Sequence, residues 1–134
     1  MTMKVKRFGV SLEEDLLNKL DQYVIENHFP NRSQAIRLLI QKTEVEKKWK
    51  DNDIVAGAIV LVYDHHKRDL QTQSTSLQHD FHDLILSVQH VHLNHDNCLE
   101  TIAVKGAAGK LTELADKLIA IKGIRHGELV MTSA

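Results

Sequence analysis

The segment that decides the architecture of the first part of the chain is Lys4-Val5-Lys6-Arg7-Phe8-Gly9-Val10-Ser11. Polar and apolar side chains roughly alternate along it, which predicts a short strand. One face of this strand is apolar, and the other face carries Arg7, Gly9 and Ser11. A single strand leaves both of its edges without hydrogen-bonding partners, so the segment needs a second strand to pair with.

Two helices are expected to follow this strand. Ser11 and Glu14 have the spacing of a capping box, which predicts that a helix begins there. Residues 27–31 break it, and a second helix is expected after Asn31. One strand and two helices cannot close a core alone, but pairing of the strand with its copy in a second chain would give a two-stranded ribbon over four helices. This ribbon-helix-helix arrangement predicts an obligate dimer that places its ribbon in the major groove of DNA.

The charge balance and the hydrophobic pattern both change near residue 50. Residues 1–50 carry a net charge of +3 and residues 51–134 a net charge of −4, with residues 44–53 predicted to be a linker. Beyond the linker the pattern predicts a ferredoxin-like βαββαβ unit. Its expected strands are 54–63, 84–93, 98–105 and 124–131, and its expected helices are 67–78 and 108–121. We therefore predict an α+β protein with two domains, residues 1–50 and residues 51–134.

Composition narrows the class of protein further. One cysteine among 134 residues cannot form an internal disulfide. The first residues are charged and unlike a signal peptide, and the longest apolar runs are too short to cross a bilayer. We expect a cytoplasmic protein with no membrane partner. Nine histidines, seven of them between His65 and His95, are the unusual feature.

The densest histidine cluster is His90-Val91-His92-Leu93-Asn94-His95-Asp96-Asn97-Cys98. In a strand, His90 and His92 point to the same face, and a turn would bring Cys98 back towards them. Two imidazoles and a thiolate suit Zn, Cu, Ni or Co better than Mg or Ca. The alternative is a pair of solvated histidines beside an inert buried cysteine.

A fourth position could hold water, as in a catalytic zinc site, or a side chain of a neighbouring subunit. The candidates for that side chain are His65, His66, His79, His82 and His95.

Several short motifs spread over the chain point to one family. They are Arg7-Phe8-x-Val10-Ser11, Asn31-Arg32-Ser33-x-Ala35-Ile36-Arg37, Tyr63-Asp64-His65-His66-Lys67-Arg68-Asp69-Leu70, Gln78-His79, His90-Val91-His92, His95-Asp96-x-Cys98-Leu99-Glu100 and Gly123-Ile124-Arg125-His126-Gly127. With these motifs the chain resembles nickel-responsive transcriptional regulators of the NikR family over essentially its whole length. The resemblance implies an ACT-type fold for the second domain and a homotetramer built as a dimer of dimers.

The resemblance also implies a nickel site shared between subunits. His90, His92 and Cys98 of one subunit would bind Ni²⁺, and His79 of the opposing subunit would complete a square plane, with His82 as the rival fourth ligand. Such tetragonal N/S ligation suits Ni(II), and binding should weaken as the pH falls because the thiol must lose its proton. Glu100 is either a partner of a metal-binding imidazole or an ordinary charge on the strand surface.

For DNA, the resemblance assigns base reading to Arg7, Gly9 and Ser11. Gly9 stands where the family usually has a hydroxyl residue, so base reading should be looser or different at that step. Lys67 and Arg68 resemble positions that contact the DNA backbone, with a solvated helix start as the alternative.

An alkali-cation site found between the domains of some relatives is not expected here. It uses carboxylates on the second helix, and Gln34 and Leu38 occupy those positions.

The function expected from these features is that of a nickel-dependent repressor of nickel-uptake genes. Metal binding at the tetramer interface would promote binding to double-stranded operator DNA. One alternative is a small metalloenzyme with an open zinc site, but the chain lacks a His-Glu-x-x-His helix or another clear general base, so no enzyme activity is expected. Another alternative is a regulator whose second domain binds an amino acid.

Overall fold

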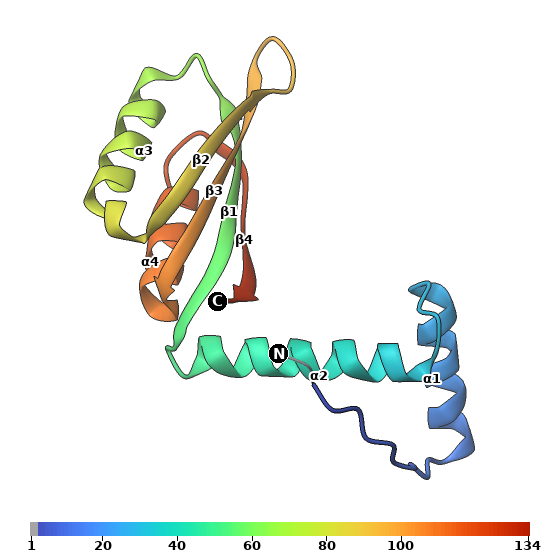
Figure 1. The fold of residues 1–134 in the computed structure, drawn as a ribbon. Helices are drawn as coiled ribbons and strands as arrows, with labels where there is room; N and C mark the ends of the chain where they lie inside the picture. The colour runs from blue at the N-terminus through green and yellow to red at the C-terminus, as the bar shows by residue number, and fades with distance from the viewer. Residues whose placement is uncertain (1–2) are drawn as a thin grey trace. The chain divides into compact units, whose positions relative to one another are not determined.

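A computed structural model describes residues 3–134 (Figure 1). The chain divides into two compact units, one ending at Lys42 and the other running from Thr43 to Ala134. The division falls within α2 (Arg32–Lys50), so this helix contributes residues to both units. Within the described range, no helix combines the length and apolar character that a bilayer-crossing segment needs.

The N-terminal segment of the first unit has no regular secondary structure. The strand predicted over residues 4–11 is not formed in the described single chain, and Phe8 is 75% exposed. A strand is defined by its hydrogen-bonded partner, and residues 3–13 have none within the described part of this chain. The alternation of side chains is therefore present without the pairing that would make it a ribbon.

Two helices complete the first unit. α1 (Glu14–Glu26) begins after Glu13, which forms no capping hydrogen bond through its side chain, so the predicted capping box at Ser11 is wrong. The start of α2 is confirmed, because Asn31 Oδ1 accepts a 2.9 Å hydrogen bond from the backbone N–H of Gln34. The Arg32 guanidinium donates bonds of 2.7 and 2.9 Å to the two carboxylate oxygens of Asp21 and so joins α2 to α1.

The expected linker is shorter than predicted. Residues 44–50 continue α2, and only the turn at residues 51–53 separates this helix from the first strand. The helix extends because Trp49 is buried in the core of the second unit, where its indole Nε1 donates a 2.9 Å hydrogen bond to the carbonyl of Thr132.

The second unit is a four-stranded antiparallel sheet with two helices packed on it, and the predicted βαββαβ order is confirmed. The strands lie in the order β2-β3-β1-β4. A short 3-10 helix over His82–Leu84 precedes β2. The elements are β1 (Ile54–Asp64), α3 (Arg68–Asp80), β2 (Ile85–His92), β3 (Asn97–Ala107), α4 (Ala108–Ile119) and β4 (Ile124–Ser133). This is the ferredoxin-like, ACT-type topology.

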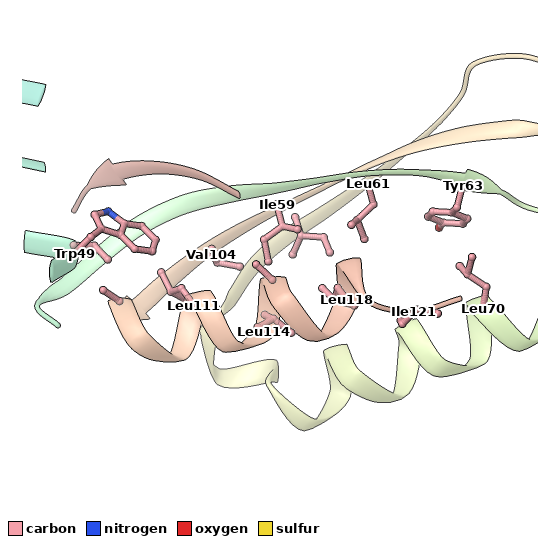
Figure 2. Packing of buried hydrophobic residues seen from close by; sticks show 14 of the residues in the cluster. Trp49, Ile59, Leu61, Tyr63, Leu70, Val104, Leu111, Leu114, Leu118 and Ile121 are labelled. Carbon is pink, nitrogen blue, oxygen red and sulfur yellow. The ribbon is translucent and has the colours of Figure 1, made fainter. Parts of the chain in front are cut away.

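The core fills the space between the sheet and the two helices, as Figure 2 shows. Alternate residues of β1, including Ile59 and Leu61, point towards α4, whose apolar stripe buries Leu111, Leu114 and Leu118 as the helical spacing predicted. The opposite sheet face carries mainly small and β-branched residues that neither α3 nor α4 covers. They include Ala58, Val60, Val62, Leu99, Ala103 and Val130.

Candidate metal centre

Strands β2 and β3 bring the predicted metal ligands to one face of the sheet. In their antiparallel register His92 lies opposite Cys98, and His90 lies opposite Glu100. Residues directly opposite each other share a face, and their Cβ atoms lie about 4.5–5.5 Å apart in such a pair. The two imidazoles and the thiol predicted to converge are therefore neighbours on adjacent strands.

The ligands differ in their exposure to solvent. β2 is an edge strand and both of its histidines are exposed, whereas Cys98 on β3 is only 3% exposed. Cys98 also lies opposite Tyr63 of β1, beneath the layer of helices. The site thus has an open imidazole side and a buried sulfur side.

The buried position of the thiol changes its acidity. Burial raises the pKa of Cys98, and the nearby carboxylates of Glu100 and Asp64 act in the same direction, while hydrogen bonding with Tyr63 opposes them. The sulfur is therefore held as a thiol at neutral pH, and a metal that binds it must displace a proton.

A buried polar network surrounds Glu100. The residue is 1% exposed, so the interpretation as a strand-surface charge is wrong. Its Oε2 accepts a 2.6 Å hydrogen bond from the Tyr63 hydroxyl, and its Oε1 accepts a 2.7 Å bond from Gln78 Nε2. Gln78 is also 3.1 Å from Ser74 Oγ on the same helix. His90 Nε2 lies 3.3 Å from Glu100 Oε2, so this carboxylate connects a predicted metal ligand to α3.

The same network raises the pKa of Tyr63 well above its usual value. Burial is the largest cause, and the hydrogen bond to Glu100 adds to it. The phenol therefore stays protonated and acts as the donor in this pair.

The two candidates for a fourth ligand lie at the end of α3. His79 is in the last helical turn and His82 follows in the 3-10 helix, and both are exposed. Their rings stack with centroids 6.0 Å apart, and His82 Nδ1 lies 3.0 Å from the carbonyl oxygen of His79.

A different group forms the tightest set of potential ligands. Among residues 3–134, His66, His95 and Asp96 are the one set of three such residues whose ligand atoms all lie within 4.8 Å of one another. The predicted nickel ligands therefore do not form a closed set within one described chain.

The predicted DNA-contacting residues lie in two exposed places. Arg7, Gly9 and Ser11 are in the N-terminal segment without regular structure. Lys67 immediately precedes α3, and Arg68 is its first residue. All five are exposed.

Sequence reasoning missed the partners of Glu100. Tyr63 and Gln78 both belong to the motifs quoted above, but no periodicity indicates that they converge on one carboxylate. His66 and His95 were among the candidates for an open metal position, whereas Asp96 was not.

The donor chemistry fits the predicted ion. Two imidazole nitrogens and one sulfur on a shared face are ligands that a borderline divalent ion such as Ni²⁺ binds well, and hard ions such as Mg²⁺ prefer oxygen.

Comparison with known families agrees with both halves of the chain. Residues 56–132 match the family described as NikR C terminal nickel binding domain. Residues 6–46 match the family described as ribbon-helix-helix protein, copG family.

Similar proteins cover nearly the same length. Proteins with the name "Putative nickel-responsive regulator" include one from Desulfotalea psychrophila, 53% identical over 96% of this chain and 95% of that protein. Another from Syntrophus aciditrophicus is 50% identical over 93% and 91%, and one from Thermococcus onnurineus is 46% identical over 98% and 96%.

One solved structure shares the fold of the second unit. It is the uncharacterized protein TM1266 from Thermotoga maritima, with a TM-score of 0.54 and 19% identity over 59% of this chain and 98% of that chain. The family matches are to transcription regulators that bind DNA and nickel, not to enzymes. The chain belongs to the NikR family of nickel-responsive regulators, with a ribbon-helix-helix DNA-binding domain followed by a nickel-binding domain.

Proposed function

We propose that this protein is a nickel-dependent repressor of nickel-uptake genes that acts as a homotetramer on double-stranded operator DNA in the cytoplasm. The observation that carries the proposal is the β2–β3 register, which places His90 and His92 on the same sheet face as Cys98. This arrangement lies in the unit that follows the ribbon-helix-helix domain. We assign residues 1–50 to DNA binding and residues 51–134 to metal binding and tetramer formation.

His90, His92 and Cys98 would hold the nickel from one subunit, and His79 of the opposing subunit would supply the fourth ligand. Ni²⁺, a d⁸ ion, prefers tetragonal ligation by nitrogen and sulfur, whereas Zn²⁺ prefers a tetrahedral site. His79 supports this role because it is exposed at the end of α3. His82, three residues further along and also exposed, is the alternative.

The uncovered sheet face supports assembly through the second unit. Val130 on this face is 52% exposed, and Val60 and Val62 lie on the neighbouring strand β1. A second copy of this chain would remove these apolar side chains from water, which stabilises an assembly by roughly 25 cal/mol for each Å² buried.

The buried network offers a physical route from the metal ligands to DNA. Glu100 lies 3.3 Å from His90 and accepts a hydrogen bond from Gln78 on α3. α3 begins directly after Lys67, which together with Arg68 is proposed to contact the DNA backbone. A bound nickel ion that fixes His90 would thus bias the position of α3. For nickel to promote DNA binding in this way, it must bind the DNA-competent state more tightly than the other state.

The ribbon would read the operator directly. Arg7 can make a bidentate contact with guanine, worth about 1–3 kcal/mol of discrimination, and Ser11 can donate or accept a hydrogen bond. Gly9 has no side chain for such contacts.

The central test is operator binding measured by fluorescence anisotropy. The DNA is a labelled fragment selected from genomic DNA by the nickel-loaded protein. We expect stoichiometric nickel to tighten binding at least tenfold and Cys98→Ser to abolish this gain. Equal affinity with and without nickel would overturn the proposal.

A second measurement separates the fourth-ligand candidates. The thiolate-to-nickel absorption band of the square-planar site should be lost in His79→Asn and kept in His82→Asn. The reverse pattern would assign the ligand to His82.

A further inference from the structure

A second set of metal-binding side chains lies outside the proposed nickel site. His66 follows β1, and His95 and Asp96 lie in the turn between β2 and β3. Their ligand atoms all lie within 4.8 Å of one another, and His66 Nε2 is 3.9 Å from Asp96 Oδ1. The three residues come from two segments about thirty positions apart, so the cluster results from the tertiary fold and not from a local run of histidines.

The turn that carries His95 and Asp96 is held by its own side chains. Asn94 Oδ1 accepts hydrogen bonds from the backbone N–H groups of Asp96, at 3.0 Å, and Asn97, at 2.8 Å. Leu93 N–H also donates to the carbonyl of Asn97 over 2.9 Å. This Asx-type turn gives the two ligands a defined backbone.

The segment that carries His66 is fixed to the same turn. The backbone N–H of His65 donates to the carbonyl of Asp96 over 3.1 Å, and His65 Nε2 lies 2.7 Å from the carbonyl of His95 and so must carry the donated hydrogen. The backbone N–H of His66 donates to Asp64 Oδ1 over 2.9 Å, and the rings of His65 and His66 lie 4.0 Å apart. The two segments are therefore joined before any ion binds.

We propose that His66, His95 and Asp96 form a second binding site for a divalent transition-metal ion, contained within one chain. Two imidazoles and one carboxylate are a donor set that first-row divalent ions accept with water in the remaining positions. The site lacks sulfur and differs in this from the cysteine-containing site. His66 Nε2 lies 3.3 Å from the carbonyl of His95, a long contact that the side chain can give up to coordinate an ion.

This inference uses none of the four residues proposed to bind nickel between subunits. It would stand if that assignment were wrong. An ion in this site would cross-link the corner between β1 and α3 to the β2–β3 turn, in addition to the hydrogen bonds described above.

Equilibrium dialysis of the intact chain against increasing Ni²⁺, with bound metal counted by elemental analysis, tests the proposal. We expect His66→Asn and Asp96→Asn each to bind one ion fewer per chain than the wild type at saturation. The matched control is His126→Asn, because His126 is also exposed and lies 3.9 Å from a single carboxylate, that of Glu128. This control should bind as many ions as the wild type.

Two outcomes would overturn the second site. One is an unchanged capacity in His66→Asn and Asp96→Asn, with far-UV circular dichroism showing that both variants are folded. The other is an equal loss in His126→Asn, which would indicate general binding to surface histidines.

The thiolate-to-nickel absorption, followed in the same titration, reports separately on the cysteine site. It should be unchanged in His66→Asn and absent in Cys98→Ser. Absence of this band in the wild type would contradict the proposed nickel ligands, while the count of bound ions would still decide the second site.

Discussion

The Tyr63 hydroxyl donates a 2.6 Å hydrogen bond to Glu100 Oε2, and both side chains are almost completely buried. Gln78 donates to the other carboxylate oxygen over 2.7 Å, so both acceptor atoms of Glu100 have partners. A buried carboxylate is tolerated only when it is hydrogen-bonded in this way. Because Glu100 also lies 3.3 Å from His90 Nε2, the network gives structural support to one of the proposed metal ligands.

Tyr63→Phe should destabilise the second unit. The substitution keeps the ring in the core but leaves Glu100 Oε2 without its short hydrogen bond, which costs about 1–3 kcal/mol. Urea unfolding followed by circular dichroism measures the change. Tyr23→Phe in α1 removes a hydroxyl from the other unit and should change the free energy of unfolding less; equal effects would contradict the role given to the Tyr63–Glu100 bond.

Glu100→Gln should weaken nickel binding while leaving the fold intact. The amide has the same shape but no negative charge to hold the His90 imidazole, and loss of such a partner typically lowers metal affinity about 10–100-fold. Competition with a chelator of known affinity measures the change. Glu128→Gln, on the exposed part of β4, is the control, and an unchanged affinity in Glu100→Gln would show that the carboxylate has only a structural role.

Nickel affinity should rise with pH. The pKa of the Cys98 thiol is raised by burial, so the group is protonated at neutral pH and loses its proton when it binds metal. Below the raised pKa, this proton alone makes the logarithm of the affinity rise by about one for each pH unit. Chelator competition between pH 6 and pH 8 tests the slope. Cys98→Ser should lose this contribution, and a wild-type affinity independent of pH would exclude the thiolate as a ligand.

Trp49→Ala should destabilise the second unit although Trp49 belongs to α2. The indole is buried against the core, and removal of a large buried side chain costs about 3–5 kcal/mol. Trp49→Phe should lose less stability than Trp49→Ala. An aromatic ring again fills part of the buried space, but the 2.9 Å hydrogen bond from Nε1 to the Thr132 carbonyl is still missing. Denaturant unfolding of both variants gives the comparison; wild-type stability in Trp49→Ala would mean that the end of α2 is not part of this core.

Gly57→Ala should strain the pairing of β1 with β4. A Cβ atom at Gly57 would lie 2.6 Å from the backbone carbonyl oxygen of Val130, which cannot move without its strand. Such overpacking costs about 1–3 kcal/mol. Gly9→Ala is the control for thermal unfolding of the second unit, because nothing lies within 4 Å of a Cβ built at Gly9. An unchanged melting temperature in Gly57→Ala would contradict the close approach.

Local patterns were sufficient for most of the second unit. The β-rich run over residues 54–63 and the pattern that follows it predicted its strands, helical spacing predicted the buried stripe of α4, and the His-x-His spacing placed His90 and His92 on one face. One error occurred where the result depends on a distant contact. The charged residues at the end of α2 predict a linker, whereas the hydrogen-bond partner that holds Trp49 in the core is 83 residues away at Thr132. The capping box at Ser11 is wrong because the helix begins two residues further along, with Glu13 and not Ser11 as its N-cap.

The sequence by itself determined the order of elements, the alternation of side chains along the strands and the chemical types of the proposed ligands, because these depend on neighbours a few positions apart. Only the tertiary structure decided that Glu100 is buried and bound by Tyr63 and Gln78, and that His66 meets His95 and Asp96. These contacts join segments about twenty to forty positions apart, and the register of the sheet and the packing of α3 set their distances. Strand period and helix period specify which way a side chain points, but not which distant side chain it meets.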